Sequence, residues 1–189
     1  MCWIAEGRWA LLAALLISAA HAQVEARLKA CVACHGPDGN SVTAGIPSIA
    51  AQPKIFAENY LVMTREGIRG NDAMQGLLKD VTDREIASLA VYFSKLPAKS
   101  PDGRTDQAVF VRGKQVAAQN RCASCHQRNF RGREQMPRLA GQREEFLAEA
   151  MLAYRQNRRR GGDTMMAAAL YGIPETDLKA LAHYLSRLK

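Results

Sequence analysis

Apolar residues recur along this chain with the period of a helix and not with that of a strand. Four of them over 86–93 and four more over 178–185 follow the spacing i, i+3, i+4, i+7, which puts each set on one helix face. Thr82 and Glu85 form a capping box before the first stripe. Pro174 stands at the matching place before the second stripe, where proline suits the start of a helix. No segment alternates with the strand period over a useful length, so the pattern predicts an all-α fold.

Weaker patterns predict further helices in each half of the chain. The segments concerned are 24–30, 54–67, 107–119 and 142–157. Gly113, inside the third segment, suits a close crossing of two helices, whereas 24–30 contains no glycine. Stretches rich in Gly, Pro and Ser, such as 36–48, are predicted to be loops.

The second half of the chain repeats the first. The offset is 91 residues at the paired cysteines, 90 at Pro47 and Pro137, and 92 at Met74 and Met166, a drift that small loop insertions produce. A repeat of this length indicates a tandem duplication and not a solenoid, which needs three or more short units. The predicted division is a leader 1–22, a first domain 23–96, a linker 97–106 rich in Pro, Gly and polar residues, and a second domain 107–189.

Residues 1–22 have the layout of a secretory signal peptide. Arg8 precedes a short apolar run that ends in a small-x-small triplet closing with Ala22. The run is shorter than the roughly 20 residues of a spanning helix, so cleavage is favoured over a membrane anchor. Cleavage is expected after Ala22, with a cut after Ala20 as the alternative. The mature protein is expected to be exported, because it carries this signal. No other segment is apolar enough to span a bilayer.

Composition narrows the classes of protein that fit. With 48% hydrophobic and 23% charged residues, the chain is ordinary for a globular protein. Aromatic residues make up only 6%, which argues against stacking platforms for single-stranded nucleic acid. The formal net charge of +8 favours an acidic partner or surface without identifying it.

Four of the five cysteines carry the candidate chemistry. They form two CxxC pairs, each followed at once by a histidine: Cys31, Cys34 and His35, then Cys122, Cys125 and His126. CxxCH is the attachment motif for c-type haem. Two thiols on one helical turn can form thioethers with the two vinyl groups of a porphyrin, and the histidine then ligates the iron from the proximal side. The sequence therefore predicts two covalently bound haem c groups.

CxxC pairs also occur in zinc sites, in thioredoxin-like redox centres and as small disulfides. A structural zinc site is disfavoured because 87 residues separate Cys34 from Cys122, whereas zinc ribbons keep their pairs close. A thioredoxin-like redox pair needs a βαβ context that the pattern does not contain. Two disulfides, which an oxidising compartment would permit, leave both adjacent histidines unexplained.

Methionine is the expected sixth ligand, because its soft sulfur suits iron in an electron carrier and raises the reduction potential. Met74 lies 39 residues after His35, and Met166 lies 40 residues after His126. Each is predicted to lie in a loop opposite the histidine, ahead of the last helix of its half. The shared register selects Met166 over its neighbour Met165, which stays open as the alternative.

The mature chain resembles the dihaem cytochromes of the c-four type, which consist of two class I cytochrome c domains in tandem, each wrapped around a covalently attached haem. The shared pattern is CxxCH, a loop containing proline, a methionine, and LAxYxS in the last helix. The resemblance implies His/Met ligation of both irons. It also implies that the carbonyls of Pro47 and Pro137 accept hydrogen bonds from the proximal imidazoles, and that Tyr92 and Tyr184 pack the last helix of each half against its first.

An electron carrier, and not an enzyme, is the expected function, because filled axial positions leave no open site for a substrate. The resemblance implies a periplasmic protein that passes single electrons from a quinol-oxidising complex or dehydrogenase to a terminal oxidase or reductase. The alternatives are the haem subunit of a larger complex such as a flavocytochrome sulfide dehydrogenase, a dihaem peroxidase, or a thiosulfate-oxidising enzyme.

The expected partners are redox proteins of the respiratory chain and not nucleic acid. No transmembrane segment is expected after signal cleavage, and peripheral attachment to the membrane is left open. Arg158, Arg159 and Arg160 are interpreted either as a solvated loop or as a cationic rim near the second haem.

Overall fold

The structure is a computed structural model and describes residues 24–70 and 72–189. The predicted signal sequence 1–22 lies outside these residues. The described part of the chain is helical and contains no strand, only an isolated bridge between Arg133 and Met136. The all-α prediction is therefore confirmed. None of the helices in the described ranges is long and apolar enough to cross a membrane.

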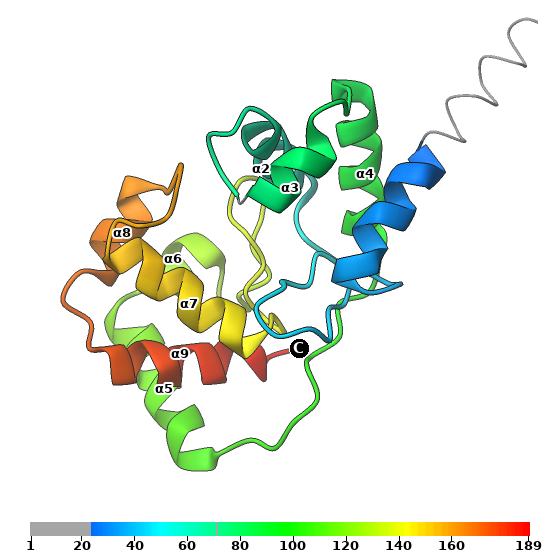
Figure 1. Cartoon of the computed structure of the whole chain (residues 1–189). Helices are drawn as coiled ribbons and strands as arrows, with labels where there is room; N and C mark the ends of the chain where they lie inside the picture. The colour runs from blue at the N-terminus through cyan, green and yellow to red at the C-terminus, as the bar shows by residue number, and fades with distance from the viewer. Residues whose placement is uncertain (1–23, 71) are drawn as a thin grey trace, which may run out of the picture.

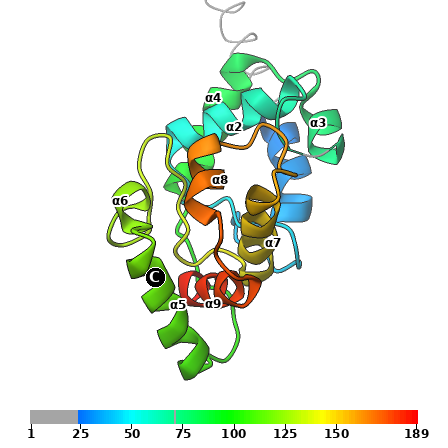
Figure 2. The same ribbon diagram turned by 90° about the vertical axis from the view of Figure 1, so that its left-hand side faces the viewer.

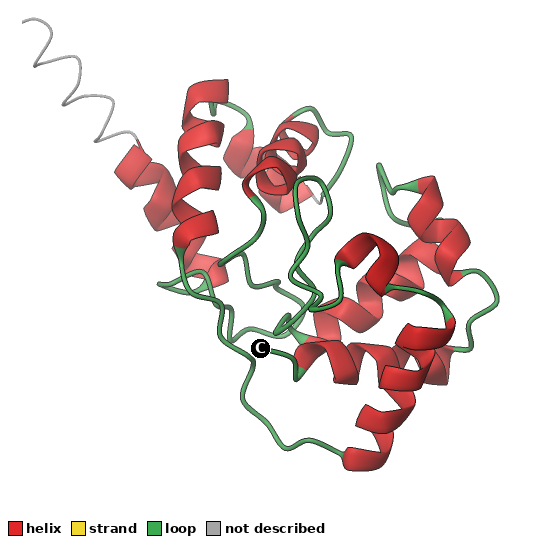
Figure 3. Cartoon of the chain, turned by 180° about the vertical axis from the view of Figure 1, so that it is seen from behind, coloured by secondary structure: helices red, strands yellow, loops and turns green. Residues whose placement is uncertain are grey.

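The helices form two groups joined by an extended segment (Figure 1). The first group contains the helix 24–35, α2 (Lys54–Arg65), α3 (Asp72–Leu78) and α4 (Asp83–Lys95); the second contains α5 (Gln107–Gln119), α6 (Ala123–His126), α7 (Glu144–Arg155), α8 (Thr164–Leu170) and α9 (Glu175–Ser186). Residues 96–106 between the groups are not helical. Figure 3 shows loops, and not helices, in the region where the two groups meet.

The expected loops around the methionines are wrong in one respect. Met74 lies in α3 and Met166 lies in α8, and both elements are helices of seven residues. Their sequences, DAMQGLL and TMMAAAL, are rich in strong helix formers. Asp163 starts the second of them, because its carboxylate accepts a hydrogen bond of 2.7 Å from the backbone N–H of Met165. Two turns are too short to produce a periodic apolar stripe.

The caps of the longer helices follow the sequence. The Thr82–Glu85 capping box is present at the start of α4: the Glu85 N–H donates to the Thr82 hydroxyl over 3.3 Å, and the Thr82 N–H donates to the Glu85 carboxylate over 2.8 Å. Asp106 caps α5 by accepting two backbone N–H bonds. Pro174 occupies the N-cap position of α9, the place that corresponds to Thr82.

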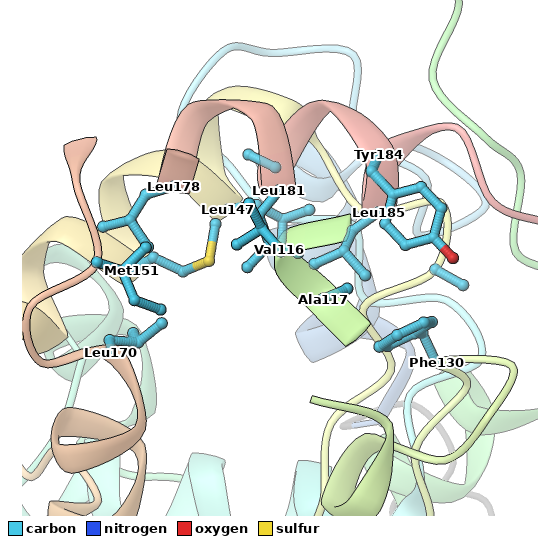
Figure 4. Packing of buried hydrophobic residues seen from close by; sticks show 13 residues of the cluster. Val116, Ala117, Phe130, Leu147, Met151, Leu170, Leu178, Leu181, Tyr184 and Leu185 are labelled. Atoms are coloured by element: carbon cyan, nitrogen blue, oxygen red, sulfur yellow. The ribbon is translucent and has the colours of Figure 1, made fainter. Parts of the chain in front are cut away.

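Each group has its own apolar core, and the predicted stripes supply the inner faces of α4 and α9. The first core consists of Leu78, Val81, Ile86, Leu89 and Phe93. The second core is larger and is shown in Figure 4; its members include Val116, Ala117, Phe130, Leu147, Met151, Leu170, Leu178, Leu181, Tyr184 and Leu185. Separate cores agree with a tandem duplication.

The crossing of α5 over α9 depends on Gly113. A Cβ at this position would lie 2.0 Å from the backbone oxygen of Ala180, so only glycine permits the approach. Tyr184 of α9 packs edge-on against Phe110 of α5, with ring centroids 5.0 Å apart. The second-half tyrosine therefore packs the last helix against the first, as the resemblance implies.

Tyr92, the matching residue of the first half, is less buried than Tyr184. Its side chain is 39% exposed, and its ring contacts Phe93 on the same helix. Phe93, one residue later, is the aromatic buried in the first core, against which Leu28 and Val32 of the helix 24–35 pack. Phe93 is thus the more buried of these two aromatic residues of α4, and the packing expected of Tyr92 against the helix 24–35 stays a prediction.

Candidate functional site

His35 ends the helix 24–35 and is buried, with only 7% of its surface exposed. Its Nδ1 lies 2.8 Å from the backbone oxygen of Pro47. Because a carbonyl oxygen can only accept, Nδ1 must carry the proton, and Nε2 keeps its lone pair for a metal. Burial lowers the pKa of this imidazole, which favours the neutral form that ligates iron.

His126 repeats this geometry at the end of α6. It is equally buried, and its Nδ1 donates to the backbone oxygen of Pro137 over 3.2 Å. Burial lowers its pKa as well. Both hydrogen bonds that the resemblance implies are thus present, and each restrains the orientation of one imidazole ring.

The cysteine pairs differ in burial within each motif. All four are free thiols; Cys31 and Cys122 are half-buried, and Cys34 and Cys125 are exposed. Burial raises the pKa of the Cys31 and Cys122 thiols. Each motif therefore offers one sulfur against an apolar core and one at the surface.

Zinc binding, disulfide formation and thioredoxin-like chemistry find no support in the described residues. They contain no group of three or more His, Cys, Asp or Glu placed to hold a metal ion, so the two cysteine pairs do not converge on zinc. They contain no disulfide. A thioredoxin-like unit needs strands, and residues 24–70 and 72–189 contain none.

The methionines differ in exposure in a way that separates the two candidates in the second half. Met166 is half-buried and packs against the second core, whereas Met165 is 76% exposed. Met74 is half-buried and packs against the first core. A sulfur that is to reach a buried iron has to leave the helix on its inner face, and Met166 does so.

Two equivalent arginines hold the methionine helices in place. Arg65, in the last turn of α2, donates to the backbone oxygen of Val81 over 2.8 Å, and Arg155, in the last turn of α7, donates to that of Ile173 over the same distance. These carbonyls follow α3 and α8, so each arginine closes the segment that carries a methionine. The repeat in the sequence would have revealed both pairs.

Two further arginines have unpaired donors. The Nε atoms of Arg69 and Arg159 are buried without a hydrogen-bond partner in the described part of the chain. The Arg69 guanidinium lies over the ring of Tyr60 at 5.0 Å, and that of Arg159 lies over the ring of Tyr154 at 4.9 Å. Each of these half-buried guanidinium groups therefore keeps one N–H that the described residues leave without an acceptor.

The run of three arginines serves three different purposes. Arg158 stays exposed and forms an ion pair with Glu149. Arg159 is the stacked residue described above. Arg160 reaches into the first half, where it donates to the backbone oxygen of Gly67 over 2.7 Å and to the carboxylate of Asp72 over 3.1 Å. Figure 2 shows the segment before α8, drawn in orange, close to the first group of helices.

Two buried glutamines link the halves, and the sequence indicates them only as repeated positions. Gln52 accepts a hydrogen bond from the Arg138 N–H (3.0 Å) and donates to the Arg138 carbonyl (3.1 Å). Gln142 accepts from the Ser48 N–H (2.7 Å) and donates to the Ser48 carbonyl (2.8 Å). Each side chain thus recognises the backbone next to the proline of the opposite half.

The donor set fits haem c in each half. One buried neutral imidazole with an available Nε2, one half-buried thioether and two thiols on one helical turn are the groups that a His/Met-ligated, covalently held haem requires.

The chain matches known cytochromes over most of its length. Residues 110–189 match the cytochrome c family, and residues 19–93 match the family described as cytochrome C oxidase, cbb3-type, subunit III. A cytochrome c4 of Azotobacter vinelandii is 28% identical over 182 residues, with 84% of both chains covered. A thiosulfate dehydrogenase electron acceptor of Thiomonas intermedia is 29% identical over 167 residues, which cover 82% of this chain and 77% of the relative.

A solved structure has the same architecture. Reduced recombinant cytochrome c4 from Pseudomonas stutzeri superposes with a TM-score of 0.78 at 28% identity, covering 88% of this chain and 98% of that one. The agreement extends over both halves and their arrangement. The two halves thus match two cytochrome families, and the whole chain is similar to cytochrome c4: it is a dihaem electron-transfer protein with two tandem domains and two covalently bound haem c groups.

Proposed function

We propose that each CxxCH motif holds one haem and that each iron has one histidine and one methionine as axial ligands. Cys31 and Cys34 form the thioethers of the first haem, with His35 and Met74 as ligands; Cys122 and Cys125 form those of the second, with His126 and Met166. The observation that carries this assignment is the pair of buried imidazoles whose Nδ1 atoms are bound to Pro47 and Pro137, which leaves Nε2 for iron in both halves.

The protein's part in electron transfer is to keep the positions of the iron ligands nearly the same in the oxidised and reduced states. Bound haem supplies a one-electron Fe(III)/Fe(II) couple. The proline carbonyls fix the imidazole planes, and the arginine contacts to Val81 and Ile173 fix the segments that follow the methionines. Ligands held in this way move little when the charge changes, and the buried histidines exclude water from the proximal side.

We further propose that the protein works in the periplasm after removal of residues 1–22, with domains over 23–96 and 107–189 and a linker over 97–106. It receives single electrons from a quinol-oxidising complex or a dehydrogenase and delivers them to a terminal oxidase or reductase. The similarity to a relative described as a thiosulfate dehydrogenase electron acceptor supports a dehydrogenase as the donor. The separate cores and the non-helical segment 96–106 support the division into domains.

The test uses the full chain expressed in a bacterium with cytochrome c maturation. Intact-protein mass spectrometry is expected to find the mature chain, without residues 1–22, carrying two haem groups. Absorption and EPR spectra of the oxidised protein are expected to show two low-spin centres with the charge-transfer band of a Met–Fe bond. One haem, or a high-spin centre that persists in both redox states, would contradict the assignment.

A further inference from the structure

Each half of the molecule contains a hydrogen-bonded chain that begins at a histidine and ends in the other half. The carbonyl of Pro47 and the N–H of Ser48 belong to one peptide group. That carbonyl accepts from His35 Nδ1 over 2.8 Å, and that N–H donates to the side-chain oxygen of Gln142 over 2.7 Å. A single peptide unit therefore stands between an imidazole of the first half and a carboxamide of the second.

An equivalent series of hydrogen bonds runs from His126 of the second half to Gln52 of the first. The peptide group between Pro137 and Arg138 accepts from His126 Nδ1 over 3.2 Å and donates its N–H to the side-chain oxygen of Gln52 over 3.0 Å. Figure 1 shows the two loops concerned, cyan and yellow, meeting at the centre of the molecule. Each half thus contributes one glutamine that binds the backbone of the other half.

The hydrogen bonds of the two glutamines are shielded from water, which strengthens them. Gln52, Gln142, Ser48 and Arg138 are all at most 9% exposed. Each carboxamide also donates to the carbonyl of the residue that it recognises, and Gln142 accepts in addition from the Arg143 N–H over 2.9 Å, so both oxygens and both amino groups are satisfied. Away from water, hydrogen bonds in series polarise one another.

We infer that Gln52 and Gln142 are positioning residues that tune the iron of the opposite half: Gln142 acts on the first centre through the Pro47–Ser48 peptide, and Gln52 acts on the second through the Pro137–Arg138 peptide. An acceptor on the peptide N–H shifts electron density onto the peptide oxygen. The imidazole N–H then binds more strongly, the ring donates more to the iron, and Fe(III) is stabilised. This inference rests on the axial ligation proposed above.

The test compares Gln142→Leu and Gln52→Leu in the holoprotein, with Gln115→Leu on the exposed face of α5 as the matched control. Each centre is followed by the proton signal of its axial methionine methyl group during an NMR-monitored redox titration. Variants of Met74 and Met166 assign the two signals. Loss of the carboxamide is expected to increase the equilibrium constant for reduction of the opposite centre about threefold. For one electron, this raises its reduction potential by about 30 mV.

The crossed pattern is what separates this role from a merely structural one. Gln142→Leu is expected to move the first centre and Gln52→Leu the second, with the centre in the same half changing less and Gln115→Leu changing neither. Equal shifts of both centres in each variant, or no shift, would overturn the inference. If a leucine variant does not fold, Gln142→Glu keeps the acceptor oxygen, strengthens it with charge, and is expected to lower the first potential.

A negative result here leaves the proposed function intact. Two low-spin His/Met centres in the unsubstituted protein establish the carrier chemistry whatever the glutamine variants do. Failure to find those centres would instead remove the ligation on which the inference rests, before any variant is compared.

Discussion

The two halves share the arrangement of histidine, proline and methionine but differ in the packing around it. Both bury a histidine against a proline carbonyl and place a half-buried methionine on a two-turn helix. The second half adds a glycine-mediated helix crossing and a larger core. Among the described residues, the first half has no equivalent buried tyrosine, and its core cluster consists of five buried residues. Covalent haem attachment therefore tolerates wide variation in the surrounding packing, as long as the histidine and methionine segments are held.

Charge separates the halves as well. Residues 24–96 contain eight Lys and Arg and eight Asp and Glu, whereas residues 107–189 contain 15 and seven. The whole formal charge of +8 thus resides on the second half. Two haem groups contribute equal numbers of propionates to each half, so the difference persists in the holoprotein. The difference predicts that an acidic partner associates with the second half.

The largest expected effect tests whether the methionine assignment holds in both halves. Met166→Ala is expected to lower the potential of the second centre by on the order of 0.1 V, within the ~0.8 V over which axial ligands set haem potentials. The first centre is expected to keep its potential. Potentiometric titration followed by absorption measures both. Met165→Ala is the matched control, because its side chain is exposed; a drop in this variant instead would transfer the ligand role to Met165.

The helix crossing at Gly113 is a feature of the second half whose contribution to stability can be removed by one substitution. Gly113→Ala is expected to destabilise the second half by about 3 kcal/mol, because the added methyl group meets the backbone of α9. Gly76→Ala in α3 is the control: a Cβ there meets nothing within 4 Å, and alanine is expected to leave stability unchanged or raise it by about 0.5–1 kcal/mol. Denaturant unfolding followed by the haem absorption measures both, and equal stabilities of the two variants would refute the crossing's role.

The charge difference predicts which centre meets an anion first. A small anionic one-electron reductant is expected to reduce the second centre several-fold faster than the first at low salt. The ratio is expected to fall towards one at about 0.5 M salt, where charges are screened over a few ångströms. Stopped-flow absorption with the assigned centres measures the two rates. A ratio independent of salt would show that accessibility, and not charge, sets the order.

The smallest effect concerns the contact between the first half and the linker. Lys99 donates a hydrogen bond to the carboxylate of Asp38, and this holds the pKa of Asp38 at about 2. Because the folded-state pKa lies below the unfolded value, the stabilisation is present above about pH 4 and is lost as the pH falls through about 2. NMR titration of the Asp38 carboxyl group measures the midpoint, which is expected to rise towards its ordinary value in Lys99→Met. An unchanged midpoint would mean that the Asn40 contacts alone hold it.

Much of this protein could be predicted from residues that are near one another in the chain. The CxxCH motifs, the Thr82–Glu85 box and the stripes over 86–93 and 178–185 each lie within three turns of a helix, where spacing alone determines which side chains share a face. The helices around the methionines were missed because two turns produce no periodic pattern. Tyr92 is less buried than Tyr184, because repetition of a residue type does not ensure repetition of its packing.

The sequence by itself determined the haem count, the all-α class and the repeat, because these depend on residue identity and local period. Only the tertiary structure decided that His35 and His126 each face a proline carbonyl, that Met166 and not Met165 turns inward, and that Gln52 and Gln142 cross between the halves. Those contacts join atoms up to 94 residues apart. No local pattern encodes the contacts of Gln52 and Gln142, because they arise from how the two halves pack together.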